Sequence, residues 1–136
     1  MHYNIKSRLE EIHKFEVEFE NQLNNLNLTK QVIFNIKLAF HEAIINVVQH
    51  TYNFEPDRNI SIELDVNKEY FECSLEDFGK HVDPEHIKPR KTEKIQSSGL
   101  GVFLYSKLMD EVEFSNTDTG NILRLKRVFK PVDFKS

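Results

Sequence analysis

The sequence predicts a two-layer α/β (α+β) sandwich in which helices cover one face of a mixed, largely antiparallel sheet. Two long segments carry apolar residues at helical spacing, and two pairs of segments alternate apolar and polar residues as strands do. Helices that precede such hairpins pack as one layer on one sheet. The 136 residues are enough to bury a core but leave little room for more, so we expect residues 1–136 to form a single domain.

The N-terminal part of the chain predicts a strand and two helices. Residues 2–6 are a candidate first strand, and a helix is expected over 8–25. Its apolar residues keep helical spacing at Leu9, Ile12, Phe15, Phe19 and Leu23. Thr29 is the expected N-cap of a second helix over 30–52, since a threonine hydroxyl accepts a hydrogen bond from a free backbone N–H. The apolar arc of this helix contains Val32, Ile36, Ala39, Phe40, Ala43, Ile44, Val47 and Val48.

The remaining chain predicts two hairpins around a long loop and a third helix. The first hairpin joins 59–67 to 69–77, and the second joins EVEFSN (111–116) to ILRLKRVF (122–129). The stretch from 78 to 98 is polar, contains two prolines and has no period, and a loop of this length in a compact domain is usually functional. Ser98 is the expected cap of a helix over 99–110.

Composition excludes several classes of function. The net charge of −4 gives no general case for nucleic-acid binding, which normally needs a basic surface. The start of the chain has no apolar signal segment, and no apolar run approaches the roughly 18 residues of a membrane span, so we expect a cytoplasmic protein without membrane contact. Cys73 is the single cysteine, which excludes an intramolecular disulfide and a cysteine-rich zinc site.

The second helix carries a polar ladder. In HEAIINVVQHTY (41–52), Glu42, Asn46 and His50 follow one another at steps of four, so an α-helix stacks them along one edge of its apolar arc. Such ladders also arise by chance, as modest polar pairs on a helix surface. The ladder is therefore weak evidence on its own. A zinc-protease HExxH motif is excluded because Ile45 stands where its second histidine would be.

Two further places combine polar groups with glycine. In LEDFG (75–79), Asp77 ends an apolar strand and can accept a hydrogen bond from a ligand amine, while Gly79 leaves room for a flat ring; a plain turn explains the same residues about as well. In SSGLGVFLYSKLMDEV (97–112), Gly99 and Gly101 stand at a helix start, where free N–H groups and the helix dipole favour an anion.

Together and in this order, the three places resemble the nucleotide-binding boxes of the GHKL ATPases. EAIINVVQHTY, DFGKHVDP and SSGLGVFLYSKLMDEVEF are most similar to the small, single-domain members, the anti-sigma-factor serine/threonine kinases of bacterial partner-switching systems. The resemblance covers nearly the whole chain. It implies the Bergerat ATP-binding fold and an ATP- and Mg²⁺-dependent kinase that phosphorylates a small antagonist protein and, in its other state, sequesters a sigma factor.

The resemblance also implies residue roles. Asn46 would hold Mg²⁺ through its amide oxygen, Glu42 would be the general base, and His50 would sit near the phosphates without a role we can assign. Asp77 would accept from the adenine amino group, with Gly79 beside the ring. The phosphates would lie at Gly99, Leu100 and Gly101, and residues 80–98 would form the ATP lid. Members of this kind look dimeric, which makes a homodimer possible.

Two positions depart from the family pattern. His81 replaces the second glycine of the adenine box, and Gly120-Asn121 stands where the family commonly has Gly-Thr. These departures leave open a non-catalytic switch that binds nucleotide or partners without phosphoryl transfer. A third reading, the detached ATPase domain of a sensor histidine kinase, would need a phosphoacceptor histidine, and His13 lacks the expected surroundings.

Overall fold

The computed structural model describes residues 1–83 and 105–136. In chain order these contain β1 (His2–Lys6), α1 (Leu9–Asn24), α2 (Lys30–Asn46), η1 (Val47–Thr51), β2 (Asn59–Val66), β3 (Tyr70–Asp77), β4 (Glu111–Asn116), β5 (Asn121–Val128) and η4 (Pro131–Asp133). Residues 105–108 are also helical and precede β4. The predicted order of strands and helices is confirmed for these residues, while the predicted helix start at 99 lies outside them.

The strands form one sheet in the order β1-β2-β3-β5-β4. Every pairing within this described sheet is antiparallel, so the sheet is not mixed as the sequence suggested. The reason lies in the connection from β1 to β2. Two antiparallel helices, rather than one crossover helix, join these strands, so the chain returns to the end of the sheet at which β1 stopped and β2 runs the opposite way.

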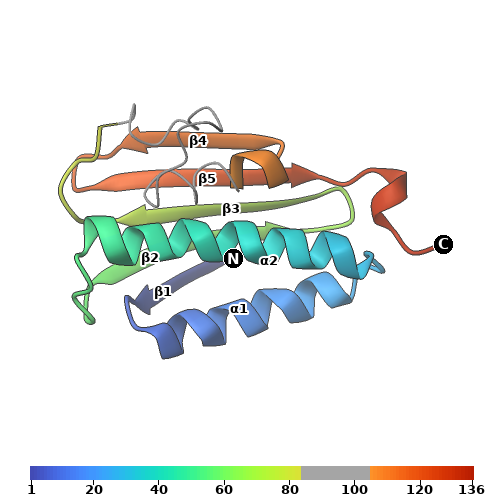
Figure 1. The fold of residues 1–136 in the computed structure, drawn as a ribbon, viewed down its shortest axis with the longest axis horizontal. Helices are drawn as coiled ribbons and strands as arrows, with labels where there is room; N and C mark the ends of the chain where they lie inside the picture. Colours follow the sequence, from blue (N-terminus) through green and yellow to red (C-terminus); the bar gives the residue numbers. More distant parts are fainter. Residues whose placement is uncertain (84–104) are drawn as a thin grey trace, which may run out of the picture.

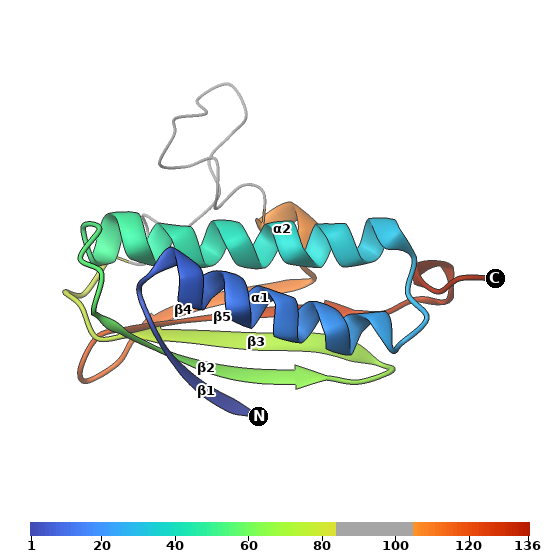
Figure 2. The same ribbon diagram turned by 90° about the horizontal axis from the view of Figure 1, so that it is seen from below.

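Both long helices cover the same face of the sheet, as Figures 1 and 2 show. α1 lies beside α2, and a salt bridge from Lys37 to Glu20 at 2.7 Å and a hydrogen bond between His41 Nδ1 and Glu16 at 3.0 Å join them. Apolar side chains of the sheet point toward the helices, and polar ones occupy the opposite face. The predicted two-layer sandwich is thereby confirmed.

The core lies between the helices and the sheet. Of the predicted apolar stripe on α1, four members are buried: Ile12, Phe15, Phe19 and Leu23. Leu9 keeps the same spacing but is 69% exposed, because it is the first residue of the helix and precedes the turns that lie on the sheet. Phe19 packs edge-on against Phe40 of α2 at 5.0 Å between ring centroids, which joins the two helices within the core.

α2 begins as the sequence predicts. The Thr29 hydroxyl accepts a hydrogen bond from the Val32 N–H at 3.3 Å, which confirms the N-cap. With η1, the helix is long and apolar enough, by length and composition alone, to cross a membrane. A core helix passes the same test, and here every residue of the predicted apolar arc is buried against the sheet or α1.

The last turn of this helix differs from the prediction of a regular α-helix to residue 52. Residues 47–51 form a π-helical turn, in which the Tyr52 N–H donates to the Val47 carbonyl at 2.9 Å. Asn53 and Phe54 then adopt positive φ angles of 52° and 66°, and the Phe54 N–H donates back to the Val48 carbonyl at 2.8 Å. Residues with positive φ commonly end helices, so the chain leaves the long helix at Asn53 and Phe54. π-helical turns are frequent at functional sites.

Candidate functional site

Asp77 is the last inward-facing residue of β3. Alternation along the strand buries Phe71, Cys73 and Leu75, and Asp77 continues this face with only 4% of its surface exposed. Its Oδ1 accepts hydrogen bonds from Asn121 Nδ2 at 2.9 Å and from the Gly79 N–H at 3.1 Å. Burial raises the pKa of the Asp77 carboxyl, and these hydrogen bonds oppose that rise. The result is a buried, oriented acceptor at the end of the sheet.

Gly79 brings the chain after β3 close to the end of the long helix. A Cβ at this position would collide with Thr51 Cγ2 and would lie 3.3 Å from Tyr52 Cε1. A side chain at 79 would thus force Thr51 to move or push the two segments apart. The sequence interpretation of Gly79 as room for a flat ring overlooked this contact.

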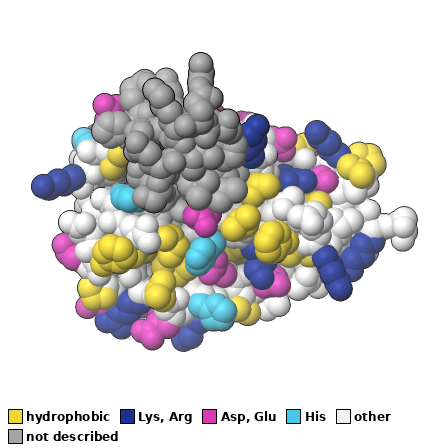
Figure 3. Space-filling view, viewed as in Figure 1, with side chains coloured by type: hydrophobic (Ala, Val, Ile, Leu, Met, Phe, Trp, Pro, Cys, Tyr) yellow, Lys and Arg dark blue, Asp and Glu magenta, His cyan; other side chains and the backbone are white. Residues whose placement is uncertain are grey.

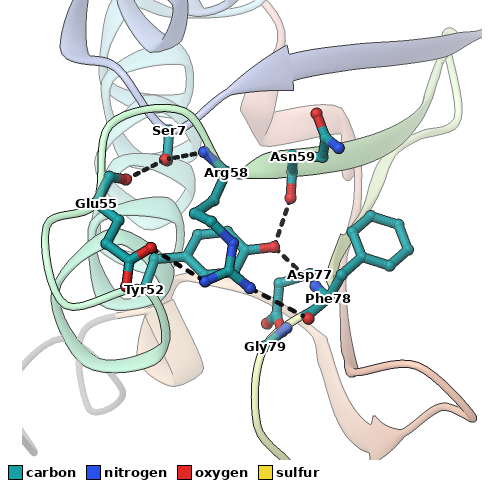
Figure 4. A network of polar contacts seen from close by, with 8 residues as sticks. All are labelled: Ser7, Tyr52, Glu55, Arg58, Asn59, Asp77, Phe78 and Gly79. Carbon is teal, nitrogen blue, oxygen red and sulfur yellow. Dashed lines mark hydrogen bonds and ion pairs between the residues drawn. The ribbon is translucent and has the colours of Figure 1, made fainter.

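Tyr52 joins the end of the long helix to the start of β2 and to the segment after β3, as Figure 4 shows. We call this region the corner. Its hydroxyl donates to the Asn59 carbonyl at 2.5 Å and accepts from the Phe78 N–H at 2.7 Å. The Arg58 guanidinium lies 4.5 Å from the centre of the Tyr52 ring and donates to the Phe78 carbonyl at 3.4 Å. Burial raises the pKa of Tyr52, so the neutral hydroxyl keeps both bonds. The corner beside Asp77 is therefore held by several independent contacts.

A groove of about 960 Å³ opens at this corner. It is lined by His50, Thr51, Asn53, Glu55, Arg58 and residues 78–83. Its volume is within the roughly 300–1,000 Å³ of small-molecule and cofactor sites. Its charges are mixed, since Arg58 and Lys80 line it together with Glu55 and Asp83. On the helix side of the molecule, Lys and Arg are likewise scattered among Asp and Glu (Figure 3).

The polar ladder of α2 is only partly preserved. Glu42 and Asn46 lie one turn apart on the α-helical part and are both half-buried. His50 lies in the π turn, where i→i+5 bonding widens the turn, and its exposed side chain lines the groove with Gly79. The structure thus places His50 with the segment after Asp77 rather than in an even ladder with Asn46.

Asn46 has a buried partner that the sequence interpretation missed. The Tyr105 hydroxyl, on the helical turn before β4, shares a hydrogen bond with the Asn46 side chain. Burial raises the pKa of Tyr105, and the bond to Asn46 opposes that rise. Arg127 of β5 donates to the Leu108 carbonyl at 3.2 Å and so joins the same turn to the sheet. Tyr105 is therefore placed to orient the Asn46 amide.

The predicted phosphate-binding residues Gly99, Leu100 and Gly101 lie outside the described residues, as does most of the predicted lid. Within residues 1–83 and 105–136, no cluster of three or more His, Cys, Asp or Glu side chains is arranged to hold a metal ion.

Sequence reasoning also missed the role of Asn121. It noted this residue only as a departure, yet Asn121 is 1% exposed and bonds directly to Asp77. The available signal was the hairpin itself, because an asparagine at an inward-facing position of a central strand needs buried polar partners. Which partners it has depends on the register of β5 against β3.

Known proteins resemble this chain in sequence and in fold. The model of the histidine kinase-like ATPase domain matches residues 5–127. The serine-protein kinase RsbW of Oceanobacillus iheyensis is 32% identical over 101 residues, which is 68% of this chain and 64% of that protein. The serine-protein kinase RsbW of Bacillus subtilis is 31% identical over 101 residues, covering 68% and 63% of the two chains.

A solved structure gives the same fold. All of this chain superposes on 34% of a crystal structure of the RsbU and RsbW domains of Rv1364c from Mycobacterium tuberculosis, with a TM-score of 0.66 and 16% identity. At this identity the likeness concerns the fold alone. The match to the Oceanobacillus iheyensis relative spans slightly less than two thirds of that protein's length.

Proposed function

The chain belongs to the family of histidine kinase-like ATPase domains, and on that premise we propose that it is an ATP- and Mg²⁺-dependent serine/threonine protein kinase acting as an anti-sigma factor. The observation that carries the proposal is Asp77, a buried carboxylate at the end of β3 beside a groove of cofactor size. About 30% identity to proteins named as serine-protein kinases supports the class of reaction.

The base of the nucleotide is assigned to Asp77. A carboxylate held by Asn121 and by the Gly79 N–H can accept a further hydrogen bond but cannot donate one while ionised. It therefore suits the exocyclic amine of adenine. The triphosphate is assigned to Gly99, Leu100 and Gly101, and the lid to 80–98, on the family resemblance.

Magnesium is assigned to Asn46, whose half-buried amide supplies one oxygen ligand while Tyr105 orients the side chain. When bound, Mg²⁺ would neutralise charge on the phosphates as the γ-phosphoryl group leaves. Glu42, one turn earlier, is assigned as the general base. Its carboxylate takes the proton of a serine or threonine hydroxyl while that oxygen bonds to the γ-phosphorus and the bond to ADP breaks.

The partners are proposed from the same resemblance. The phosphorylated substrate is a small antagonist protein, and the protein sequestered in the other state is a sigma factor. Both proposals place the chain in the cytoplasm, as a homodimer, without contact to nucleic acid or membrane. The mixed distribution of charge on the helix side is consistent with a protein partner rather than a nucleic acid (Figure 3).

One observation favours a second candidate, a nucleotide-binding switch without phosphoryl transfer. His81, which replaces a family glycine, is bonded through Nε2 to the Thr117 carbonyl at 2.7 Å. This contact ties the start of the predicted lid to the β4–β5 hairpin. A segment restrained in this way would bind nucleotide without the rearrangement that transfer needs.

A transfer assay separates the two candidates. The chain is incubated with Mg²⁺, γ-labelled ATP and each of a panel of purified antagonist proteins from partner-switching systems. The kinase proposal expects label on a serine or threonine of at least one antagonist, and no label with Glu42→Ala. Tight ATP binding without transfer to any antagonist would favour the switch, and absence of ATP binding would refute both.

A further inference from the structure

Three polar side chains line up across the ends of neighbouring strands. In the sheet register, Asp77 of β3 faces Asn121 of β5, and Asn121 faces Asn116 of β4. Asp77 and Asn121 are buried, and Asn116 bonds to Asn121 from the exposed edge strand. Cross-strand neighbours of this kind contact each other directly. We call these three residues the strand-end triad.

Asn121 uses its full hydrogen-bonding capacity within this corner. Its Nδ2 donates to Asp77 Oδ1 and to the Lys80 carbonyl, both at 2.9 Å. Its Oδ1 accepts from the Val82 N–H at 2.9 Å and from Asn116 Nδ2 at 2.8 Å. An amide has two donor hydrogens and two acceptor lone pairs, so each has a partner.

These partners determine the orientation of the amide. The Val82 N–H can only donate, so the atom of Asn121 that faces it must be the oxygen. The nitrogen must then face Asp77 and the Lys80 carbonyl. A flipped amide would set donor against donor at Val82 and oxygen against carboxylate at Asp77. The Asp77 carboxylate therefore always faces the N–H donor of Asn121.

The same side chain links Asp77 to the segment that follows β3. Through Asn121, the carboxylate is connected to both Lys80 and Val82, and Asn116 adds a bond to the Val82 carbonyl at 3.1 Å. Gly120 makes this arrangement possible, because a Cβ there would collide with the Asp77 carbonyl. A threonine in place of Asn121 has one hydroxyl donor and could not make all of these bonds at once.

We propose that Asn121 is a positioning residue that holds the Asp77 carboxylate as an acceptor and couples it to residues 80–82. As a result, the site selects purines with an exocyclic amine, such as adenine, over purines that carry a carbonyl group in place of that amine. The selection rests on the proposed nucleotide-binding function. A fixed carboxylate bonds to the amine of adenine but opposes the carbonyl oxygen of hypoxanthine with its own lone pairs. Without Asn121, the carboxylate is free to rotate or to accept a proton, and the selection weakens.

The test compares ATP with inosine triphosphate, which carries a carbonyl in place of the amine. Dissociation constants for both, with Mg²⁺, are measured by calorimetry for the wild type, Asn121→Ala, Asn121→Thr and Asn116→Ala. The ratio of the two constants should fall at least about tenfold in Asn121→Ala, the effect of one charge-assisted hydrogen bond. Asn121→Thr should recover part of the ratio. The control Asn116→Ala should change it little, since its side chain does not contact Asp77.

The outcomes separate the inference from the proposed function. An unchanged ratio in Asn121→Ala, or equal weakening of both nucleotides, would overturn the positioning role. A wild type that binds neither nucleotide, or does not distinguish them, would refute the assignment of adenine to Asp77 and the selection with it. The coupling is then judged by hydrogen exchange without ligand: faster exchange of the Val82 N–H in Asn121→Ala supports it, and unchanged exchange overturns it.

Discussion

The substitution Asp77→Asn tests the nucleotide site with little change of shape. The side-chain oxygen of an asparagine at 77 can still accept from Asn121 and from the Gly79 N–H, which keeps the corner intact. The substitution changes the other end of the side chain, where an amide NH₂ donor replaces the second carboxylate oxygen. A donor there opposes the adenine amine instead of accepting from it.

The size of the effect follows from the lost interaction. A hydrogen bond to a charged group contributes about 1.5–3 kcal/mol, so the dissociation constant for ATP should rise roughly 10- to 100-fold. At an ATP concentration 100 times the wild-type dissociation constant, the wild type gains about 2.7 kcal/mol and its Tm rises by about 10 °C. At the same concentration the variant gains about 0.4–1.4 kcal/mol, which raises its Tm by about 1–6 °C.

The assay is thermal unfolding of both proteins with and without Mg-ATP. Without ligand, the variant should unfold at or slightly above the wild-type temperature at neutral pH. Burial raises the pKa of Asp77 in the folded state, so its contribution to stability is fully present below the unfolded-state pKa and is lost as pH rises through the folded-state pKa. The asparagine of the variant does not ionise, so its stability does not fall with rising pH in this way. An equal rise of Tm with Mg-ATP in both proteins would refute the adenine assignment.

Three further substitutions test other parts of the site. Glu42→Ala should lower phosphoryl transfer at least about 100-fold while ATP affinity changes less than about threefold, because only the base is lost; normal transfer with weakened binding would contradict the assignment. Tyr52→Phe leaves two backbone groups at the ends of β2 and β3 without a partner and should cost about 1–3 kcal/mol in urea unfolding, whereas Tyr70→Phe, whose hydroxyl is exposed, should cost far less. Gly120→Ala should destabilise the fold by about 1–3 kcal/mol, because the new methyl group meets the Asp77 carbonyl; wild-type stability in urea would show that the strand ends can separate.

Much of the fold follows from local pattern. The helical spacing of apolar residues predicted α1 and α2 almost to their observed bounds, and the alternation of apolar and polar residues predicted both hairpins. The inward direction of Asp77 is of the same kind, because it continues the alternation of β3. Patterns of this kind are read within one segment and need no knowledge of its neighbours.

The π turn at 47–51 is a different case. Its residues fit the spacing of an α-helix, and the sequence carried the ladder from Glu42 to His50 without a break. The wider turn occurs where the helix meets Gly79 and where Tyr52 bonds to the ends of two strands. Those contacts come from residues distant in sequence, so spacing alone could not reveal them.

The sequence by itself determined the periodicity of each element, the inward-facing carboxylate at 77 and the order of the family's boxes. Only the tertiary structure decided that Asn121 faces Asp77, that Asn46 meets Tyr105, and that the missing side chain of Gly79 accommodates Thr51. The physical reason is that a side chain's direction along its own strand or helix is set by local geometry. Its hydrogen-bond partner is set by the register and packing of segments that meet only in the folded chain.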